Sequence, residues 1–295
     1  MESILNYYYG INVSNIKKYN NDYLVDANNS TYLLSELHEE IDELQKIINI
    51  LNNTDIKYHL LVLTKDNNLF ITYDNKNYCL LKIRIPQNEK ISIFTFQNTK
   101  TTGICNWGEI WSQRIDYYES QVEELIKDES IKYALQYYIG LTEIAIYYLN
   151  ILKDTYDNNT LNYIISHKTL HSPLNSLNYY NPLNMKIDLE IRDLAEYIKM
   201  SYFNEILTDY ELLHLLDNLK FTEPMANYLF LRLLYPSYFF NLYDDYIETK
   251  KIDSKMIKYI KKSKDYESLL SKIYSRLSQN NKIIIRLWFL KAQHL

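Results

Sequence analysis

The order of apolar and polar positions predicts a sheet near the N-terminus that is interrupted by one helix. Two extended segments, YLVDA and STYLLSEL, lie within residues 22–37 and meet at Asn28-Asn29. Asparagine tolerates a positive φ, so this pair predicts a tight hairpin. Over residues 39–51 apolar side chains recur at helical spacing with acids on the other face, which predicts an amphipathic helix.

Three further apolar runs, LLVLT, LFITY and YCLLKIRI, are separated by KDNN and DNKN and predict an antiparallel meander. Later in the chain the apolar spacing becomes helical. Residues 138–152 are apolar nearly all round, as in a central helix, and one stripe holds Trp107, Trp111, Ile115, Tyr118, Val122 and Leu125. The expected architecture is α+β, with a small β-rich lobe at residues 1–100 and a large helical lobe at residues 101–295.

Composition narrows the class of protein. Hydrophobic residues make up 47% and charged residues 23% of the 295 residues, which is typical of a globular chain. The net charge of −5 argues against a nucleic-acid partner, and a solvated helix face explains the basic cluster KYIKKSK at residues 258–264. Cys79 and Cys105 lie far apart, so neither a disulfide framework nor a zinc site is expected. No signal peptide or membrane-spanning apolar run is evident, so we expect cytoplasmic synthesis and no transmembrane segment.

Tyrosine is unusually frequent, with 31 residues, and glycine unusually rare, with 4. The joint abundance of Asn, Ile, Lys and Tyr favours an AT-rich genome as the cause over a surface for stacking or oxidative cross-linking. The few glycines provide no phosphate-binding loop. Gly103 and Gly108 are followed by no Lys-Ser or Lys-Thr pair, so they do not form one.

The residues that can carry chemistry concentrate between positions 163 and 199. The segment HKTLHSPL resembles the catalytic-loop pattern H-G-D-L-H-P-G-N of aminoglycoside-phosphotransferase-like kinases, with His167, Leu170 and His171 at its H, L and H. Downstream, IDLEIRDLAEYIK resembles the acidic position of that family followed by its D-L-A helix. The resemblance implies a two-lobed, protein-kinase-like fold.

Two departures from the loop pattern affect the chemistry. Thr169 stands where the family has its catalytic Asp, and Leu174 stands where it has a metal-binding Asn. Asn175 could replace that Asn only if the loop were re-registered. Asp188 alone would be a weak magnesium site, and in many relatives the metal-binding Asp lies further upstream, near Asn181. We therefore expect no catalytic residue, no bound metal and no residual ATP or magnesium binding, with Asp188 the position where any remnant would occur.

The resemblance assigns structural roles to the other residues of this segment. Imidazole titrates near neutral pH, but the family position of His167 packs the loop, so we expect catalysis at neither His167 nor His171. Arg192 and Asp193 begin the D-L-A helix and are expected to anchor it, since an Asp there also caps free N–H groups. We expect His167, Asp188 and Asp193 to gather near the junction of the lobes. Asp188, as an acid facing the cleft, should have fewer protein donors than Asp193.

The small lobe also lacks the phosphate-binding Lys of the family. Aligning TYLL with the apolar residues before that Lys places Ser35 at its position. A serine supplies no charge to neutralise nucleotide phosphates. Acids in the following helix, at Glu39, Glu40 and Glu43, then have no Lys to pair with and are interpreted as a solvated face.

Further segments carry a more specific resemblance. The two tryptophans of W-x-x-x-W, YYIGLTEIAIYYL, RDLAEYIK and LRLLYPSYFFNLYDDY are similar to spore coat kinase-like proteins of the CotS group, most of all its YutH-type branch, over roughly residues 20–250. The resemblance implies a spore-forming bacterium, other coat proteins as partners, and a non-catalytic (pseudokinase) role in the spore coat. Two alternatives stay open: an active small-molecule phosphotransferase with displaced catalytic residues, and a generic kinase-fold interaction protein. The sequence leaves the oligomeric state undetermined.

Overall fold

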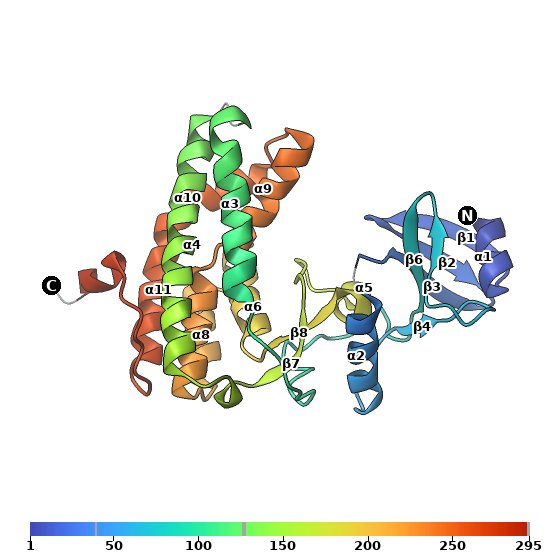
Figure 1. Ribbon diagram of the computed structural model, residues 1–295, viewed down its shortest axis with the longest axis horizontal. Coiled ribbons are helices and arrows are strands. Elements are labelled where there is room, and N and C mark those ends of the chain that lie inside the picture. The colour runs from blue at the N-terminus through green and yellow to red at the C-terminus, as the bar shows by residue number, and fades with distance from the viewer. Residues whose placement is uncertain (39, 126–127, 294–295) are drawn as a thin grey trace. The chain divides into compact units, whose positions relative to one another are not determined.

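The computed structural model describes residues 1–38, 40–125 and 128–293, with the backbone alone at 121–125 and 291–293 (Figure 1). The chain divides into two compact units. Unit 1 contains Met1–Thr101 and Ile164–Ile187, and unit 2 contains Thr102–Tyr163 and Asp188–Leu295. Unit 1 holds an antiparallel sheet and unit 2 is helical, which confirms the expected α+β class.

A six-stranded antiparallel sheet forms the framework of unit 1. Its strands are β1 (Val13–Tyr19), β2 (Asp22–Ala27), β3 (Ser30–Glu36), β4 (Leu60–Val62), β5 (Ile71–Tyr73) and β6 (Lys76–Lys82), in the order β1-β2-β3-β6-β4 with β5 also on β6. Asn28 and Asn29 both have positive φ between β2 and β3, so the predicted hairpin is confirmed. The expected meander is wrong in its pairing, because β4 pairs with β6 and not with β5. Residues 78–81 of β6 form a continuous buried run, which suits a strand with neighbours on both sides.

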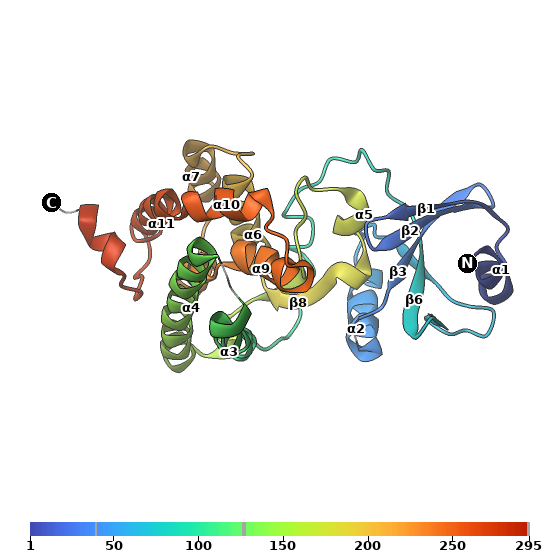
Figure 2. The ribbon, with the colours of Figure 1, turned by 90° about the horizontal axis from the view of Figure 1, so that it is seen from above.

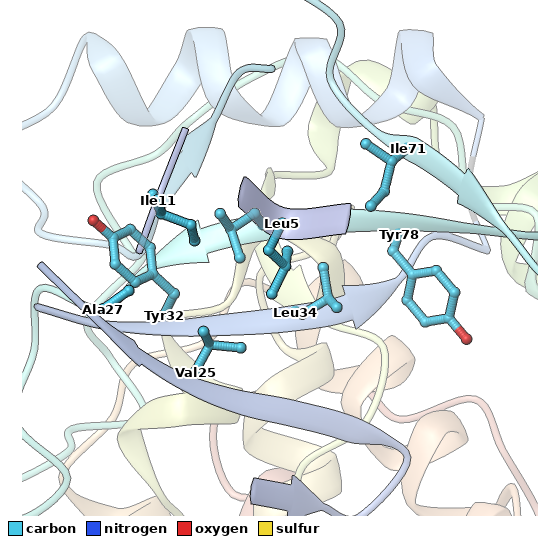
Figure 3. Close-up of a cluster of buried hydrophobic side chains, with 9 residues drawn as sticks. Leu5, Ile11, Val25, Ala27, Tyr32, Leu34, Ile71 and Tyr78 are labelled. Carbon is cyan, nitrogen blue, oxygen red and sulfur yellow. The ribbon is translucent and has the colours of Figure 1, made fainter. Parts of the chain in front are cut away.

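Helix α1 (Glu2–Tyr9) closes one side of this sheet and was not predicted from the sequence. It ends at Gly10, whose φ of 68° places it in the left-handed region that glycine adopts without strain. Leu5 is fully buried among side chains that include Ile11, Val25 and Leu34 (Figure 3). This contact anchors the N-terminal helix to the sheet through apolar burial.

Helix α2 (Ile41–Asn52) packs on the loop segment of unit 1, and its formation confirms the predicted helix. Glu39 lies outside the described residues, while Glu40 and Glu43 are exposed. The loop segment is residues 164–187 of unit 1. It contains α5 (Ser176–Tyr179), a 3-10 turn (Pro182–Asn184) and most of β7 (Tyr163–His167) and β8 (Met185–Leu189), which pair with each other. Ile47 and Leu51 of α2 share one apolar cluster with the side chains Tyr58, Ile85, Phe96, Ile165, Tyr179, Tyr180 and Met185.

Unit 2 is a bundle of helices. Its members are α3 (Trp107–Leu125), α4 (Glu129–Thr155), α6 (Arg192–Phe203), α7 (Asp209–Asp217), α8 (Glu223–Leu234), α9 (Ser237–Thr249), α10 (Ser254–Lys261) and α11 (Ser263–Leu277), followed by a 3-10 turn (Trp288–Gln293). Helix α4 packs against α3 and α8, and α8 packs against α6 and α11 (Figure 1). The first four members of the predicted apolar stripe are buried in α3, whereas the side chains of Val122 and Leu125 lie outside the described residues.

Candidate functional site

His167 ends β7 and holds the loop that follows it. Its side chain is only 1% exposed, and its Nε2 lies 2.8 Å from the carbonyl oxygen of Tyr179. A carbonyl oxygen can only accept, so Nε2 carries the proton of this bond. The ring also stacks on that of Tyr179 at 4.2 Å and meets Phe96 edge to face at 5.4 Å. These contacts make His167 a packing residue of unit 1.

The backbone of Thr169 is clamped by the side chain of Asn184. The Thr169 amide donates to Asn184 Oδ1 at 3.3 Å, and Asn184 Nδ2 donates to the carbonyl oxygens of Thr169 at 3.0 Å and Asn178 at 3.2 Å. Thr169 itself is exposed, and its hydroxyl is not a base at neutral pH. Sequence reasoning missed Asn184, whose only local signal is an amide just before an apolar strand.

Leu174 and Asn175 contribute to the structure of the same loop. Leu174 is half-buried and packs on the apolar cluster that includes Tyr179 and Met185. The Asn175 side chain accepts a hydrogen bond from the Asn178 amide at 3.0 Å, which caps helix α5. The position expected for a metal-binding Asn is therefore apolar, and the neighbouring amide oxygen is engaged in capping.

Ser35 faces a carboxylate on the neighbouring strand. Its Oγ donates to Asp22 Oδ1 at 2.7 Å, and Ser35 is only 6% exposed. Burial raises the pKa of Asp22, although the Ser35 hydrogen bond acts in the opposite direction. His171 lies near this acid. The side chain of His171 is exposed, yet the surrounding protein lowers its pKa, and the Asp22 charge only partly offsets that effect. A carboxylate therefore lies beside Ser35, and the assignment of Ser35 to the family's Lys position stays a prediction.

Asp188 lies in unit 2 and is saturated by protein donors. Its carboxylate accepts from Trp107 Nε1 and from the Leu189 amide, both at 2.8 Å, while Arg192 Nη1 lies 3.2 Å from its second oxygen. Asp188 is only 3% exposed. The indole of a distant tryptophan and an arginine four residues on thus both reach Asp188, while the expectation that Asp193 has more protein donors stays a prediction.

A buried charge network extends from this point through α6 and α8. Lys199 Nζ donates to Glu196 Oε1 at 2.9 Å, to Ser237 Oγ at 2.7 Å, and to the carbonyls of Arg232 and Tyr235 at 3.0 Å. Arg232 and Ser237 also donate to the Glu196 carboxylate, at 2.8 and 2.7 Å. Burial alone would raise the pKa of Glu196, but the Lys199 and Arg232 cations hold it well below its ordinary value. Sequence reasoning missed this network, whose local signal is a Glu and a Lys three residues apart on α6.

Arg192 and Asp193 lie in the first turn of α6. Arg192 is 7% and Asp193 4% exposed. Burial lowers the pKa of Arg192, and the nearby Arg232 charge adds to the effect while Asp188 opposes it. His167 belongs to unit 1, and Asp188 and Asp193 belong to unit 2, so the gathering of these three residues stays a prediction.

His59 is a further buried histidine of unit 1 that sequence reasoning did not find. It is fully buried, its Nδ1 accepts from the Arg84 amide at 3.3 Å, and its Nε2 lies 3.0 Å from the Ser176 carbonyl. These two partners require the neutral tautomer with the proton on Nε2. Burial lowers the pKa of His59 to about 4, despite the bond to Ser176. The neutral ring thus donates a hydrogen bond to the carbonyl of Ser176, the first residue of α5, and helps to hold that helix in place.

Within the described residues, no group of three or more His, Cys, Asp or Glu side chains is arranged to hold a metal ion. Across the same part of the chain, no helix combines the length and apolarity needed to cross a bilayer. In each unit, the buried polar side chains described above are bonded to other protein groups and do not converge as free ligands.

The fold of this chain is similar to that of solved phosphotransferase structures. It is similar to the aminoglycoside phosphotransferase from Alicyclobacillus acidocaldarius subsp. acidocaldarius DSM 446, with a TM-score of 0.57, 10% identity, and coverage of 90% of this chain and 93% of that chain. It is also similar to spectinomycin phosphotransferase APH(9)-Ia in its AMP-bound complex, with a TM-score of 0.60, 13% identity, and coverage of 93% and 97%. The predicted kinase-like fold is confirmed.

A family model gives the second step of the identification. Residues 2–273 match the family described as "Spore coat putative kinase YutH", so the chain belongs to that family. The resemblance inferred from the sequence is confirmed. No curated protein matches the chain.

Proposed function

We propose that this protein is a pseudokinase that serves as a binding or structural component of the spore coat and does not transfer phosphate. The observation that carries the proposal is that protein donors already bind the carboxylate of Asp188. A magnesium ion needs free carboxylate oxygens, whereas both oxygens of Asp188 are bonded to Trp107, Leu189 and Arg192. Freeing them would separate the Asp188 carboxylate from the buried Arg192 cation, which is costly.

The other positions of the resemblance support the same conclusion. Thr169 supplies no base, and Leu174 supplies no metal ligand. Phosphoryl transfer depends almost entirely on positioning and charge stabilisation, and each lost group typically costs about 3–4 kcal/mol of barrier lowering. At Ser35 the expected phosphate-binding lysine is absent, and the neighbouring Asp22 adds a carboxylate that would repel phosphate.

The structural residues of the loop and of α6 fit a fold kept for binding. We infer that Arg192 and Asp193 anchor the start of α6, since both are buried at its first turn. His167 retains its packing contacts although the catalytic position beside it is lost. Membership of a spore coat family supports coat association, with other coat proteins as the partners.

Purified protein tests the catalytic half of the proposal. We expect no phosphate transfer from radiolabelled ATP and no ATP–magnesium binding by calorimetry, with an active aminoglycoside phosphotransferase as positive control. ATP turnover that disappears in Asp188→Asn but persists in the matched surface variant Asp116→Asn would overturn it in favour of the active phosphotransferase.

Spore fractionation tests the other half. A tagged protein expressed from its own promoter should appear late in sporulation and be extracted with the coat layer. Recovery only in vegetative cells would favour the generic kinase-fold interaction protein instead.

A further inference from the structure

The exposed side of α3 and α4 carries mostly negative charge. Its exposed carboxylates are Glu109, Asp116, Glu119, Glu129, Glu143 and Asp154. None of these six forms an ion pair with any residue in the described ranges. Among the described side chains of the two helices, the cations are Lys132, Lys153 and Arg114, and Arg114 is engaged by Asp244 of α9. Among the described residues, the six carboxylates of this acidic surface thus outnumber the two cations of the same helices that are not engaged elsewhere, Lys132 and Lys153.

Aromatic side chains lie between these acids. Tyr133 and Tyr147 of α4 are 67% and 62% exposed, and Tyr117 of α3 is 50% exposed. Tyr133, Glu143 and Tyr147 share one exposed stripe of α4, since steps of three and four residues connect them. Tyrosine faces attract ammonium groups through cation–π contacts. The chemistry of the acidic surface thus suits a partner rich in lysine.

Unit 2 carries such a lysine-rich surface itself, around α10. Its exposed ammonium groups are those of Lys250, Lys251, Lys255, Lys261 and Lys264, and none of them has an ion-pair partner among the described residues. Between residues 250 and 264 the single acid is Asp253, whose side chain caps α10. Two other lysines of this stretch, Lys258 and Lys262, are bonded to Glu205.

The two surfaces lie on different sides of unit 2. Figure 2 shows α3 and α4 along one side of the bundle and α10 along the other. They cannot neutralise each other within one molecule, but each can meet its complement on a neighbouring molecule. We propose that the acidic surface of α3 and α4 binds the lysine-rich surface around α10 of a second copy of this chain.

Such a contact is heterologous, so an associated pair keeps one free acidic surface on one copy and one free lysine-rich surface on the other. Repetition of a heterologous contact that does not close produces an open chain of subunits. Helix α4 has 27 residues and is about 40 Å long, whereas α10 has 8 residues and is about 12 Å long. A specific interface needs about 800 Å² on each partner. This inference does not depend on whether the kinase-like site binds nucleotide.

Sedimentation velocity over a range of protein concentrations tests the proposal. At about 0.01 M salt, where the Debye length is about 30 Å, we expect the average mass to rise steadily with concentration. At about 1 M salt, where it is about 3 Å, we expect monomer alone. Monomer at every concentration and both salt levels would overturn the proposal.

Charge reversal locates the contact. Asp116→Lys/Glu143→Lys reverses two of the six charges of the acidic surface, and Lys255→Glu/Lys261→Glu reverses two of the five charges of the lysine-rich surface. Each double variant should raise the concentration of half-association at least about tenfold, because like charges then face each other. An equimolar mixture of the two variants should associate again, since the unmodified lysine-rich surface of the first variant meets the unmodified acidic surface of the second, and the two altered surfaces are also complementary.

Matched controls carry the same charge changes elsewhere. Glu43→Lys/Glu89→Lys and Lys17→Glu/Lys18→Glu alter exposed side chains of unit 1 and should associate like the unmodified protein. Equal loss in variants and controls would mean that net charge, and not these surfaces, governs association. That result, or a mixture that stays monomeric, would overturn the assignment.

Discussion

Trp107 donates its indole Nε1–H to the carboxylate of Asp188 over 2.8 Å, and both side chains are buried. The guanidinium carbon of Arg232 lies 5.0 Å from the centroid of the same indole. One tryptophan therefore joins Asp188, the position where any remnant of magnesium binding would occur, to the charge network of α6 and α8. The Asp188 carboxylate is therefore a buried hydrogen-bond acceptor for protein groups rather than a solvated metal ligand.

This relationship predicts a large effect on stability. Asp188→Ala removes the buried carboxylate that accepts from Arg192 and from the indole N–H of Trp107. We expect the free energy of unfolding to fall by about 3–5 kcal/mol, as when one member of a buried ion pair is deleted. Urea denaturation monitored by circular dichroism measures this change. Asp116→Ala, at an exposed position of α3, is the control and should stay within about 0.5 kcal/mol. If the two variants unfold alike, the Asp188 contacts contribute nothing to the fold.

A second prediction concerns the missing phosphate-binding cation. Ser35→Lys alone should not create nucleotide binding, because the new ammonium group would pair with Asp22, which already lies 2.7 Å from the serine hydroxyl. In Ser35→Lys/Asp22→Asn that partner is removed, and the lysine becomes available to phosphate. We expect weak, magnesium-independent ATP binding by calorimetry in the double variant only. Equal binding by the single variant would show that Asp22 does not oppose the phosphate.

Local features of the fold were predictable from the sequence because local periodicity and turn chemistry encode them. The Asn28-Asn29 hairpin and the amphipathic helix α2 belong to this group. Strand β1 was missed, because no position in it is fully buried and its apolar signal is weak. Helix α1 was missed as well, since its burial of Leu5 depends on a sheet formed later in the chain.

The candidate site also has some features that could be predicted from the sequence and others that could not. That Thr169 and Leu174 lack the needed chemistry can be read from the residue types alone. The saturation of Asp188 could not be read, since its indole donor lies 81 residues away. The hydrogen bond between His59 and the Ser176 carbonyl joins residues that are 117 positions apart in the sequence, so no local pattern predicts it.

The buried neutral ring of His59 predicts a dependence of stability on pH. Its pKa is about 4 in the folded protein, against about 6.5 when unfolded. Between these values the unfolded chain binds a proton that the folded chain does not, so stability is lost as the pH falls through this window. The full shift corresponds to about 3 kcal/mol. Urea unfolding at pH 7 and pH 4 should therefore show a smaller loss in His59→Gln than in the unmodified protein. His214→Gln, at an exposed histidine, should behave as the unmodified protein does.

The last prediction concerns the Glu196–Lys199 pair in the charge network of unit 2. Glu196→Met leaves Lys199 and Arg232 as buried cations without their anion, and we expect a loss of about 3–5 kcal/mol. Lys199→Met removes one cation and leaves Glu196 paired with Arg232 and Ser237, so its cost should be smaller.

A double-mutant cycle distinguishes mutual dependence from independent contributions. In Glu196→Met/Lys199→Met one charge of each sign is gone, and the pair no longer requires desolvation. Replacement of a buried ion pair by apolar side chains is often neutral or stabilising, so the double variant should be more stable than Glu196→Met alone. We expect a coupling energy of about 0.5–3 kcal/mol from chemical denaturation of the four proteins at one pH and salt concentration. Strict additivity would mean that Lys199 is held by Tyr235, Ser237 and the Arg232 carbonyl, and that its charge does not depend on Glu196.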